Sequence, residues 1–340
     1  MTLNPRLPNE LHSRPQWNLP SLVAGIQEGN TAALARAITL AESQLDADIP
    51  FQQELFSSVK PPKHSTRRIA ISGVPGAGKS TFIEKYALHL LEEDSHAKIA
   101  VLAIDPSSTL RKGSLLGDKT RMEHLGTHPR AYVRPSPTRG TLGGVTSVTR
   151  QAIVLCEAAG FTHVLVETVG VGQSEMTAHS LTDCFLLLLL PGAGDGLQGI
   201  KRGIMEMADV VLIHKSDRQP EEARAAALEG LQALRLTKST EELSDWMVPV
   251  IVGSSATEEG LSEVAQAIDR FFRHSLANGQ WIHRRRDQEK HRFQEALNLA
   301  ILNRFYTDSK NKEATQWALA KVESGSWTSD EAVDYCVKNG

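Results

Sequence analysis

Residues 67–81 read RRIAISGVPGAGKST, and this stretch decides the fold. Residues 67–72 read as a short strand, residues 73–80 spell G-x-x-x-x-G-K-S, and the residues that follow have helical character. A strand, a glycine-rich turn and a helix in this order are the context of a phosphate-binding P-loop. The stretch therefore predicts a site for a nucleoside triphosphate.

The chemistry of this loop indicates what its residues do. Glycines at 73, 76 and 78 permit backbone dihedrals that turn several N–H groups toward one anion. The helix N-terminus adds partial positive charge, Lys79 can reach the terminal phosphates, and the Ser80 hydroxyl can ligate Mg²⁺. We expect the nucleotide to contact Gly73, Val74, Pro75, Gly76, Ala77, Gly78, Lys79, Ser80 and Thr81.

Apolar runs alternate with amphipathic helical patterns from residue 67 onward. This alternation predicts an α/β fold, a P-loop NTPase with a mainly parallel sheet covered by helices on both faces. The expected strands are residues 69–72, 99–104, 132–134, 163–167, 184–190, 210–214 and 249–252. We expect a helical region over 1–60, the P-loop domain over 61–275 and a helical extension over 276–340.

Acidic residues stand where two of the expected strands end. Asp105 follows the strand 99–104, and an acid there can hold Mg²⁺ or orient water, although a turn-forming Asp-Pro is the alternative. Glu167 ends a buried strand with Gly170 three positions later, the layout of a Walker B acid and a switch glycine. A purely structural glutamate is less favoured, because a carboxylate at the end of a buried strand needs a partner.

Two polar, glycine-containing segments have the composition of mobile loops. Residues 113–122 include Asp118 and carry both charges, as a loop closing over phosphates would. Residues 191–201 surround Asp195, Gln198 and Lys201 with glycines at the mouth of the same sheet. We interpret both segments as conformational switches.

The segment His214-Lys215-Ser216-Asp217 resembles the N-K-x-D sequence with which many GTPases read guanine. The aspartate accepts hydrogen bonds from guanine N–H groups and can reject adenine, which would leave it unpaired. His214 stands where asparagine is usual. Backbone N–H groups of Ser254-Ser255-Ala256 can complete the base site. We favour GTP over ATP because Asp217 is retained.

The composition of the chain limits the classes of binding partner that we expect. The 340 residues carry a net charge of −3, which gives no reason to expect nucleic acid or an anionic membrane. The basic run at 283–286 is followed by acids and reads as a solvated helix face. Three widely spaced cysteines indicate neither a disulfide framework nor a zinc site, and a cytoplasmic setting fits. The longest apolar run is too short to span a bilayer, so we expect no membrane insertion.

A long helical pattern covers residues 281–306, with Phe293, Leu297, Ala300, Ile301 and Phe305 along one stripe. An apolar stripe outside the sheet must be buried somewhere. We favour a homodimer, and docking of the helix on its own domain is the alternative.

Taken together, IDPSS, GDKTRM, VETVGVGQSE, PGAGD-x-LQGIK and the modified NKAD resemble the MeaB/ArgK family, which includes the methylmalonic aciduria type A proteins. The resemblance implies a homodimeric GTPase that acts as a chaperone for an adenosylcobalamin-dependent methylmalonyl-CoA mutase, with GTP and Mg²⁺ gating cofactor loading or protection. It also implies that Asp105, Asp118 and Glu167 join Ser80 around the metal, and that residues 192–201 form a third switch. Gly196 departs from the family there, since an acid is common at that position.

Two other functions compete with this reading. A P-loop kinase for a small molecule, or an ATPase associated with basic amino acid transport, would use the same motifs but would need an acceptor pocket, of which the sequence gives no sign. A metal-delivery GTPase would need clustered Cys and His ligands, whereas the twelve histidines are scattered.

Overall fold

The computed structural model describes residues 17–43, 45–60, 65–104, 122–134, 142–168, 173–192, 202–237 and 245–339. The chain divides into two compact units, the first ending at Asn278 and the second beginning at Gly279. Across the described residues no helix combines the length and the apolar character that crossing a membrane requires.

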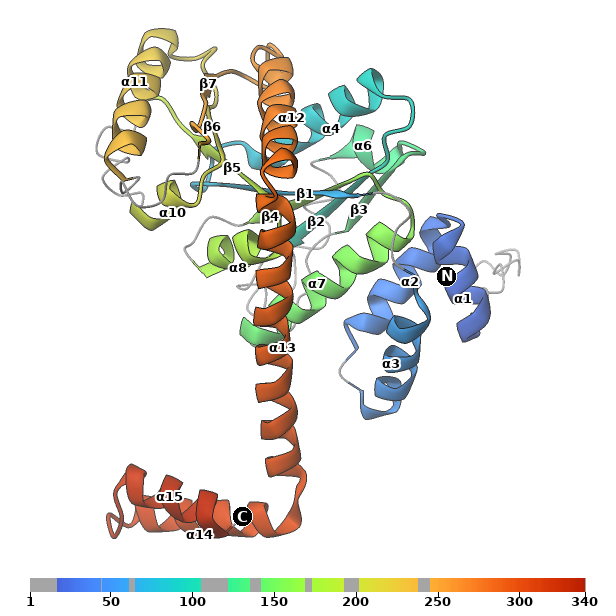
Figure 1. The fold of residues 1–340 in the computed structure, drawn as a ribbon, viewed down its shortest axis with the longest axis vertical. Coiled ribbons are helices and arrows are strands. Elements are labelled where there is room, and N and C mark those ends of the chain that lie inside the picture. The colour runs from blue at the N-terminus through green and yellow to red at the C-terminus, as the bar shows by residue number, and fades with distance from the viewer. Residues whose placement is uncertain are drawn as a thin grey trace, which may run out of the picture. The chain divides into compact units, whose positions relative to one another are not determined.

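The first unit is built on a seven-stranded sheet in which every neighbouring pair is parallel (Figure 1). The strand order is β3-β2-β4-β1-β5-β6-β7. The strands are β1 (Arg67–Gly73), β2 (Ile99–Ile104), β3 (Ala131–Arg134), β4 (His163–Thr168), β5 (Cys184–Leu189), β6 (Val210–Ile213) and β7 (Val250–Val252). The fold prediction is confirmed, and the expected strands differ from the observed ones by at most two residues at an end.

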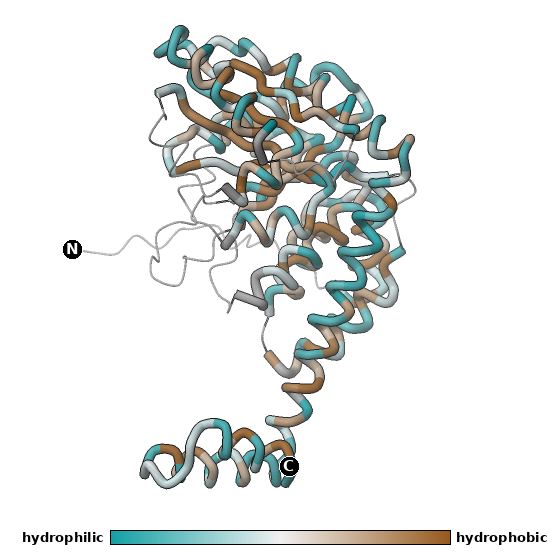
Figure 2. The backbone as a smooth tube through the Cα atoms, turned by 60° about the vertical axis from the view of Figure 1, so that its left-hand side comes forward, coloured by the Kyte–Doolittle hydropathy of each residue, from teal (hydrophilic) through white to brown (hydrophobic). Residues whose placement is uncertain are grey.

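Buried apolar side chains explain why these segments form strands. All six residues of β5 and all four of β6 are buried, as is typical of a parallel sheet covered on both faces. Figure 2 shows hydrophobic segments running through the sheet and hydrophilic ones along much of the carboxyl-terminal helices. The strand β1 lies between β4 and β5, so the turn after it opens at the middle of the sheet edge.

Helices cover the two faces of the sheet in two groups. On one face, α4 contacts both α6 and α12. On the other face, α7 contacts α8, and α10 contacts α11. The bounds are α4 (Lys79–Glu93), α6 (Glu123–Thr127), α7 (Leu142–Ala158), α8 (Gln173–Leu181), α10 (Arg202–Glu206), α11 (Pro220–Thr237) and α12 (Leu261–Ala277).

Three amino-terminal helices, α1 (Leu19–Gln27), α2 (Thr31–Ala41) and α3 (Ile49–Ser58), pack on the α7 side of the first unit. A short 3₁₀ turn, Asp46–Asp48, precedes α3. Asn30 caps α2 by accepting hydrogen bonds from Ala32 N at 2.9 Å and Ala33 N at 3.1 Å. Glu42, just past α2, forms an ion pair with Arg134 of β3, which ties these helices to the sheet edge.

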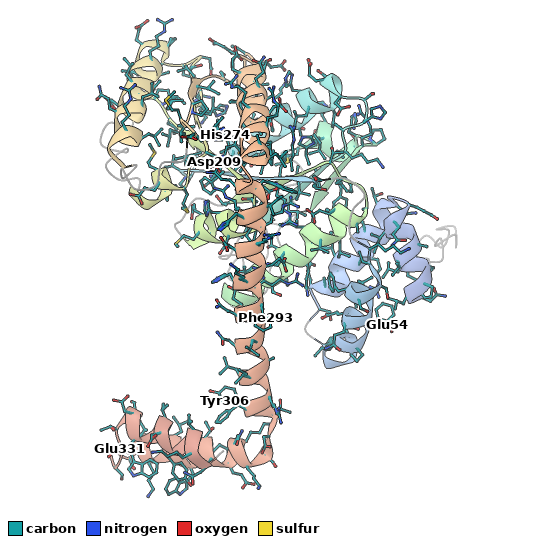
Figure 3. The ribbon with its side chains drawn as sticks, viewed as in Figure 1. Glu54, Asp209, His274, Phe293, Tyr306 and Glu331 are labelled. Atoms are coloured by element: carbon teal, nitrogen blue, oxygen red, sulfur yellow. The ribbon has the colours of Figure 1, made fainter. Side chains whose placement is uncertain are left out.

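The second unit consists of α13 (Gln280–Thr307), α14 (Ser309–Glu323) and α15 (Ser329–Asn339). A capping box precedes α15: Thr328 N donates to Glu331 Oε2 at 2.8 Å, and Glu331 N donates to Thr328 Oγ1 at 3.3 Å. Phe293 and Tyr306 project from α13 (Figure 3), and their side chains are 67% and 54% exposed.

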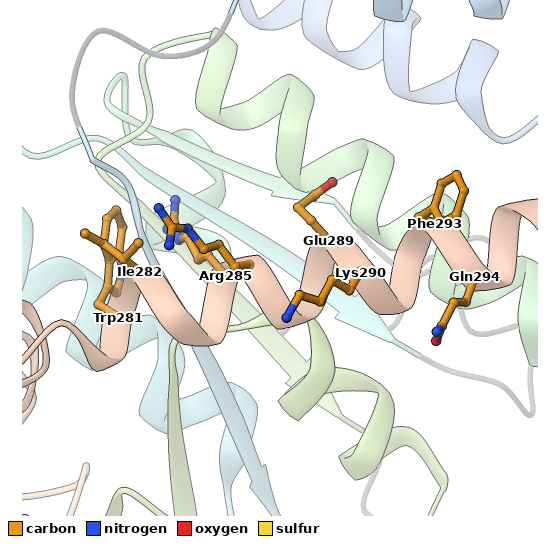
Figure 4. Close-up of a pocket in the computed structure, with 8 residues that line it drawn as sticks. Trp281, Ile282, Arg285, Glu289, Lys290, Phe293 and Gln294 are labelled. Carbon is orange, nitrogen blue, oxygen red and sulfur yellow. The ribbon is translucent and has the colours of Figure 1, made fainter.

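One stretch of α13 lines a hollow of about 750 Å³ (Figure 4). The guanidinium of Arg285 lies 4.2 Å from the centre of the Trp281 ring, so the cation and the ring stack within this stretch. The lining residues are Trp281, Ile282, Arg285, Arg286, Glu289, Lys290, Phe293 and Gln294.

Candidate functional site

The P-loop joins the end of β1 to the start of α4 at the middle of the sheet edge. Gly73 is required by a close approach, because a Cβ there would lie 2.3 Å from the carbonyl oxygen of Leu188 in the neighbouring strand. Gly76 and Gly78 have φ angles of +80° and +88°, which side chains other than glycine rarely adopt. Gly78 is also the N-cap residue, directly before the first residue of α4.

Lys79 lies at the first position of α4 and its side chain is buried, 8% exposed. Its Nζ donates to the carbonyl oxygens of Gly73 at 2.8 Å and Val74 at 3.2 Å. Burial lowers the pKa of the ammonium group, and the negative charges of Glu167 and Glu175 oppose that effect. The side chain is therefore buried, with two carbonyl groups of the loop itself as the partners of its ammonium group.

Ser80 and Glu167 come from different parts of the chain and meet beside the P-loop. Ser80 Oγ donates to Glu167 Oε1 at 2.7 Å. Strand pairing causes this contact, since β1 and β4 are parallel neighbours in which Ile71 is opposite Glu167. A hydroxyl and a carboxylate side by side are the hard oxygen ligands that Mg²⁺ prefers.

Three further polar side chains near the P-loop were not predicted as site residues from the sequence. Thr168 Oγ1 donates to Ser72 Oγ at 2.9 Å, joining the ends of β4 and β1 in the interior. Glu175, in α8, is 1% exposed and close enough to act electrostatically on Lys79. The sequence did contain signals for these residues: Ser72 and Thr168 are polar residues at the ends of two apolar strands, and Glu175 is an acid inside the segment VETVGVGQSE.

The predicted guanine segment contacts the P-loop directly. His214 is 2% exposed, and its Nδ1 lies 2.7 Å from the carbonyl oxygen of Ala77. Lys215 Nζ donates to the carbonyl oxygen of Gly76 at 2.7 Å, and Lys215 adopts a φ of +62°. Two consecutive side chains after β6 therefore hold two consecutive carbonyl groups of the loop after β1.

The loop after β7 completes this side of the site. Ser254 Oγ donates to a carboxylate oxygen of Asp217 and accepts from Ala256 N at 3.1 Å. His214 Nε2 lies 2.7 Å from Ser255 Oγ and 3.2 Å from Ser255 N. The loops after β1, β6 and β7 thus meet at the carboxyl edge of the sheet, where ligands of such folds bind.

The remaining predicted residues either line this site or fall outside the described part of the chain. Val74 is half-buried against the core, and Pro75 and Thr81 are exposed. Six predicted residues lie outside the described residues: Asp105, Asp118, Gly170, Asp195, Gln198 and Lys201.

Among the described residues, no group of three or more His, Cys, Asp or Glu side chains is placed to hold a metal ion. Ser80 and Glu167 supply two oxygen groups, and the other expected ligands, Asp105 and Asp118, fall in the undescribed stretch 105–121.

Comparison with known proteins agrees with this geometry. A Mycobacterium tuberculosis protein described as a probable GTPase is 44% identical over 308 residues, covering 90% of each chain. The mouse protein named methylmalonic aciduria type A homolog, mitochondrial, is 42% identical over 344 aligned residues, covering 96% of this chain and 81% of its own. A solved structure described as an LAO/AO transport system kinase superposes with a TM-score of 0.72 at 29% identity, covering 94% of this chain and 96% of its own.

Residues 34–310 match the family described as methylmalonyl Co-A mutase-associated GTPase MeaB. This match spans the sheet, the P-loop and the guanine segment together. The chain therefore belongs to the MeaB family of P-loop GTPases.

Proposed function

We propose that this GTPase depends on Mg²⁺ and acts as a chaperone for an adenosylcobalamin-dependent acyl-CoA mutase of the methylmalonyl-CoA mutase type. GTP binding and hydrolysis would gate the loading and protection of the mutase cofactor. The observation that carries the proposal is the meeting of the P-loop, the Ser80–Glu167 pair and the segment 214–217 at one sheet edge in a chain of this family. The name of the mouse relative supports the choice of partner.

Different side chains would contact the phosphates and the base of the nucleotide. Lys79 would exchange its two carbonyl partners for the terminal phosphates, which are stronger acceptors because they are charged. Asp217 is exposed, and its carboxylate can accept from guanine N–H groups while Ser254 holds it in place. In the structure Ser255 N donates to His214 Nε2 and Ala256 N donates to Ser254 Oγ, so these backbone groups would have to exchange partners to reach the base.

Ser80 and Glu167 would hold Mg²⁺, with Asp105 and Asp118 as the further ligands that we propose. The Ser80–Glu167 contact of 2.7 Å shows that a hydroxyl and a carboxylate oxygen already converge. Mg²⁺ bound there would neutralise charge on the outer phosphates of the nucleotide. Replacing Glu167 with glutamine removes the negative charge of this carboxylate, so we expect weaker Mg²⁺ binding and slower hydrolysis.

The proposal is tested by measuring GTP hydrolysis by the full chain with and without a purified cobalamin-dependent acyl-CoA mutase. We expect a rate that depends on Mg²⁺ and rises several-fold with the mutase. Glu167→Gln should reduce the rate, while Glu221→Gln, at an exposed acid of α11, is the matched control and should not. A cognate mutase that neither binds the protein nor changes its rate would contradict the chaperone role.

We also propose that the second unit mediates homodimerisation. Phe293, Leu297 and Ile301 recur at helical spacing on α13 and are 67%, 45% and 56% exposed. A second copy could bury this stripe. Sedimentation of a Phe293→Asp/Ile301→Asp variant should show monomers, and Arg292→Gln is the control because residue 292 lies on a different side of the helix. A wild-type chain that sediments as a monomer at micromolar concentration would refute the proposal.

A small-molecule kinase is the second candidate, and the observation that favours it is the name of the similar solved structure, a transport system kinase. Labelled GTP incubated with the protein and basic amino acids would decide between the two. Label appearing in a metabolite supports the kinase, and label released only as phosphate supports the GTPase.

A further inference from the structure

The imidazole of His214 connects three segments that are far apart in the sequence. It follows β6, contacts Ala77 of the P-loop through Nδ1, and contacts Ser255 of the loop after β7 through Nε2. The ring is 2% exposed and meets the ring of Phe82 of α4 edge-on, with centroids 5.9 Å apart. Both of its nitrogens are therefore engaged by protein atoms.

The partners of the two nitrogens determine which of them carries the proton. The carbonyl oxygen of Ala77 can only accept, so Nδ1 must donate to it. The backbone N–H of Ser255 can only donate, so Nε2 must offer its lone pair. His214 is consequently neutral and protonated on Nδ1.

The surroundings of the ring favour this neutral form. Burial lowers the pKa of His214, and the positive charge of Lys215 lowers it further, whereas the Ala77 carbonyl and the charge of Asp217 raise it. Lys215 and Asp217 lie on the segment of His214 itself. The P-loop contacts the ring through the carbonyl group of Ala77, α4 through the ring of Phe82, and the loop after β7 through Ser255.

Protonation of Nε2 would turn its contact with Ser255 N into one between two N–H donors, and Ser255 Oγ, 2.7 Å from Nε2, would have to accept instead of donate. Ser255 N, in a residue that is 3% exposed, would then lose its acceptor, and a buried N–H without a partner is unfavourable. The same loop has a second anchor, the ion pair of Lys85 Nζ with Glu258 Oε1 at 2.6 Å. That pair raises the pKa of Lys85 and lowers the pKa of Glu258, so it stays charged while His214 titrates.

We propose that His214 is a positioning residue for nucleotide binding, whose neutral ring fixes the P-loop relative to residues 254–256 and whose protonation releases them. Guanine nucleotide affinity then falls as the pH is lowered. This inference rests on the proposed function, because a nucleotide would span the phosphate loop and the base loop that the ring joins. The ring itself offers no N–H to the base, since Ala77 already accepts its single proton.

The test compares GDP dissociation constants by calorimetry, with Mg²⁺ present, from about pH 8 to about pH 5.5. Asparagine offers one N–H and one oxygen but no group that titrates in this range, so His214→Asn should give the flatter profile. We expect the affinity of the wild type to fall several-fold more than that of His214→Asn, since one pKa unit of coupling sets an upper limit of about tenfold. His96→Asn, at an exposed histidine beyond α4, should follow the wild type.

His214→Ala removes both contacts and should weaken GDP binding about 30-fold at pH 8, as the loss of two hydrogen bonds worth about 1 kcal/mol each implies. Thermal unfolding shows whether each variant is folded. Nitrogen-15 shifts of the wild-type imidazole, measured without nucleotide, should report the Nδ1-protonated tautomer.

Superimposable pH profiles for the wild type and His214→Asn, or a proton on Nε2 at neutral pH, would overturn this inference and leave the proposed function intact. A wild-type chain that binds neither GDP nor GTP at any pH would overturn both.

Discussion

Substituting Gly78 with alanine probes the contact between the P-loop and the guanine segment. Gly78 has a φ of +88°, and an added Cβ would lie 2.9 Å from His214 Cε1 and 3.0 Å from His214 Nδ1. The ring cannot swing away freely, because Ala77 and Ser255 hold its two nitrogens. The substitution therefore combines backbone strain with displacement of a fixed ring.

The two contributions can be estimated separately. A left-handed conformation costs a residue with a Cβ about 1–2 kcal/mol. Displacing the ring weakens at least one buried hydrogen bond, which adds about 1 kcal/mol or more. Gly76→Ala is the matched control: its φ is +80°, yet no atom lies within 4 Å of the added Cβ. We expect Gly78→Ala to cost about 2–4 kcal/mol and Gly76→Ala about 1–2 kcal/mol.

Calorimetric unfolding of the nucleotide-free full chain measures the loss of stability in both variants. At roughly 2–4 °C per kcal/mol, the unfolding midpoint of Gly78→Ala should lie several degrees below that of Gly76→Ala. In a His214→Ala background the additional cost of Gly78→Ala should disappear, because no ring remains to be displaced. Equal midpoints for the two alanine variants, or an undiminished cost in that background, would refute this reasoning.

Three further predictions concern other parts of the first unit. Lys79→Gln should abolish GTP binding in calorimetry while a cooperative unfolding transition persists, and unfolding of the chain would contradict it. Glu157→Ala removes the carboxylate that lies 2.7 Å from Arg68 Nε in a mostly buried ion pair. We expect this change to lower the free energy of unfolding in urea by about 3–5 kcal/mol. Glu221→Ala breaks an exposed pair and should change stability by less than about 1 kcal/mol. Burial lowers the pKa of His163 from 6.5 to about 4, so stability should fall by about 3 kcal/mol as the pH drops from about 6.5 to about 4. His163→Gln should lose that dependence, and an unchanged slope would refute the assignment.

Local patterns were enough to place most elements. A buried parallel strand such as β5 is a continuous apolar run, so its six residues could be recognised without knowing their neighbours. Asn30 and Thr328 cap helices through contacts within three residues, which lie inside one sequence window. The P-loop is equally local, since its glycines, lysine and serine act within one turn.

The site itself depends on contacts that no window contains. Ser80 meets Glu167, and His214 meets Ala77 and Ser255, only because the strand order brings the ends of β1, β4, β6 and β7 to one edge. In the sequence His214 is a departure from N-K-x-D; in the structure it is a neutral link between two loops. The sequence alone determined the elements and the phosphate loop, because propensity, capping and periodicity act over a few residues. Tertiary structure decided the burial of Lys79 and the role of His214, because both follow from groups that folding brings together.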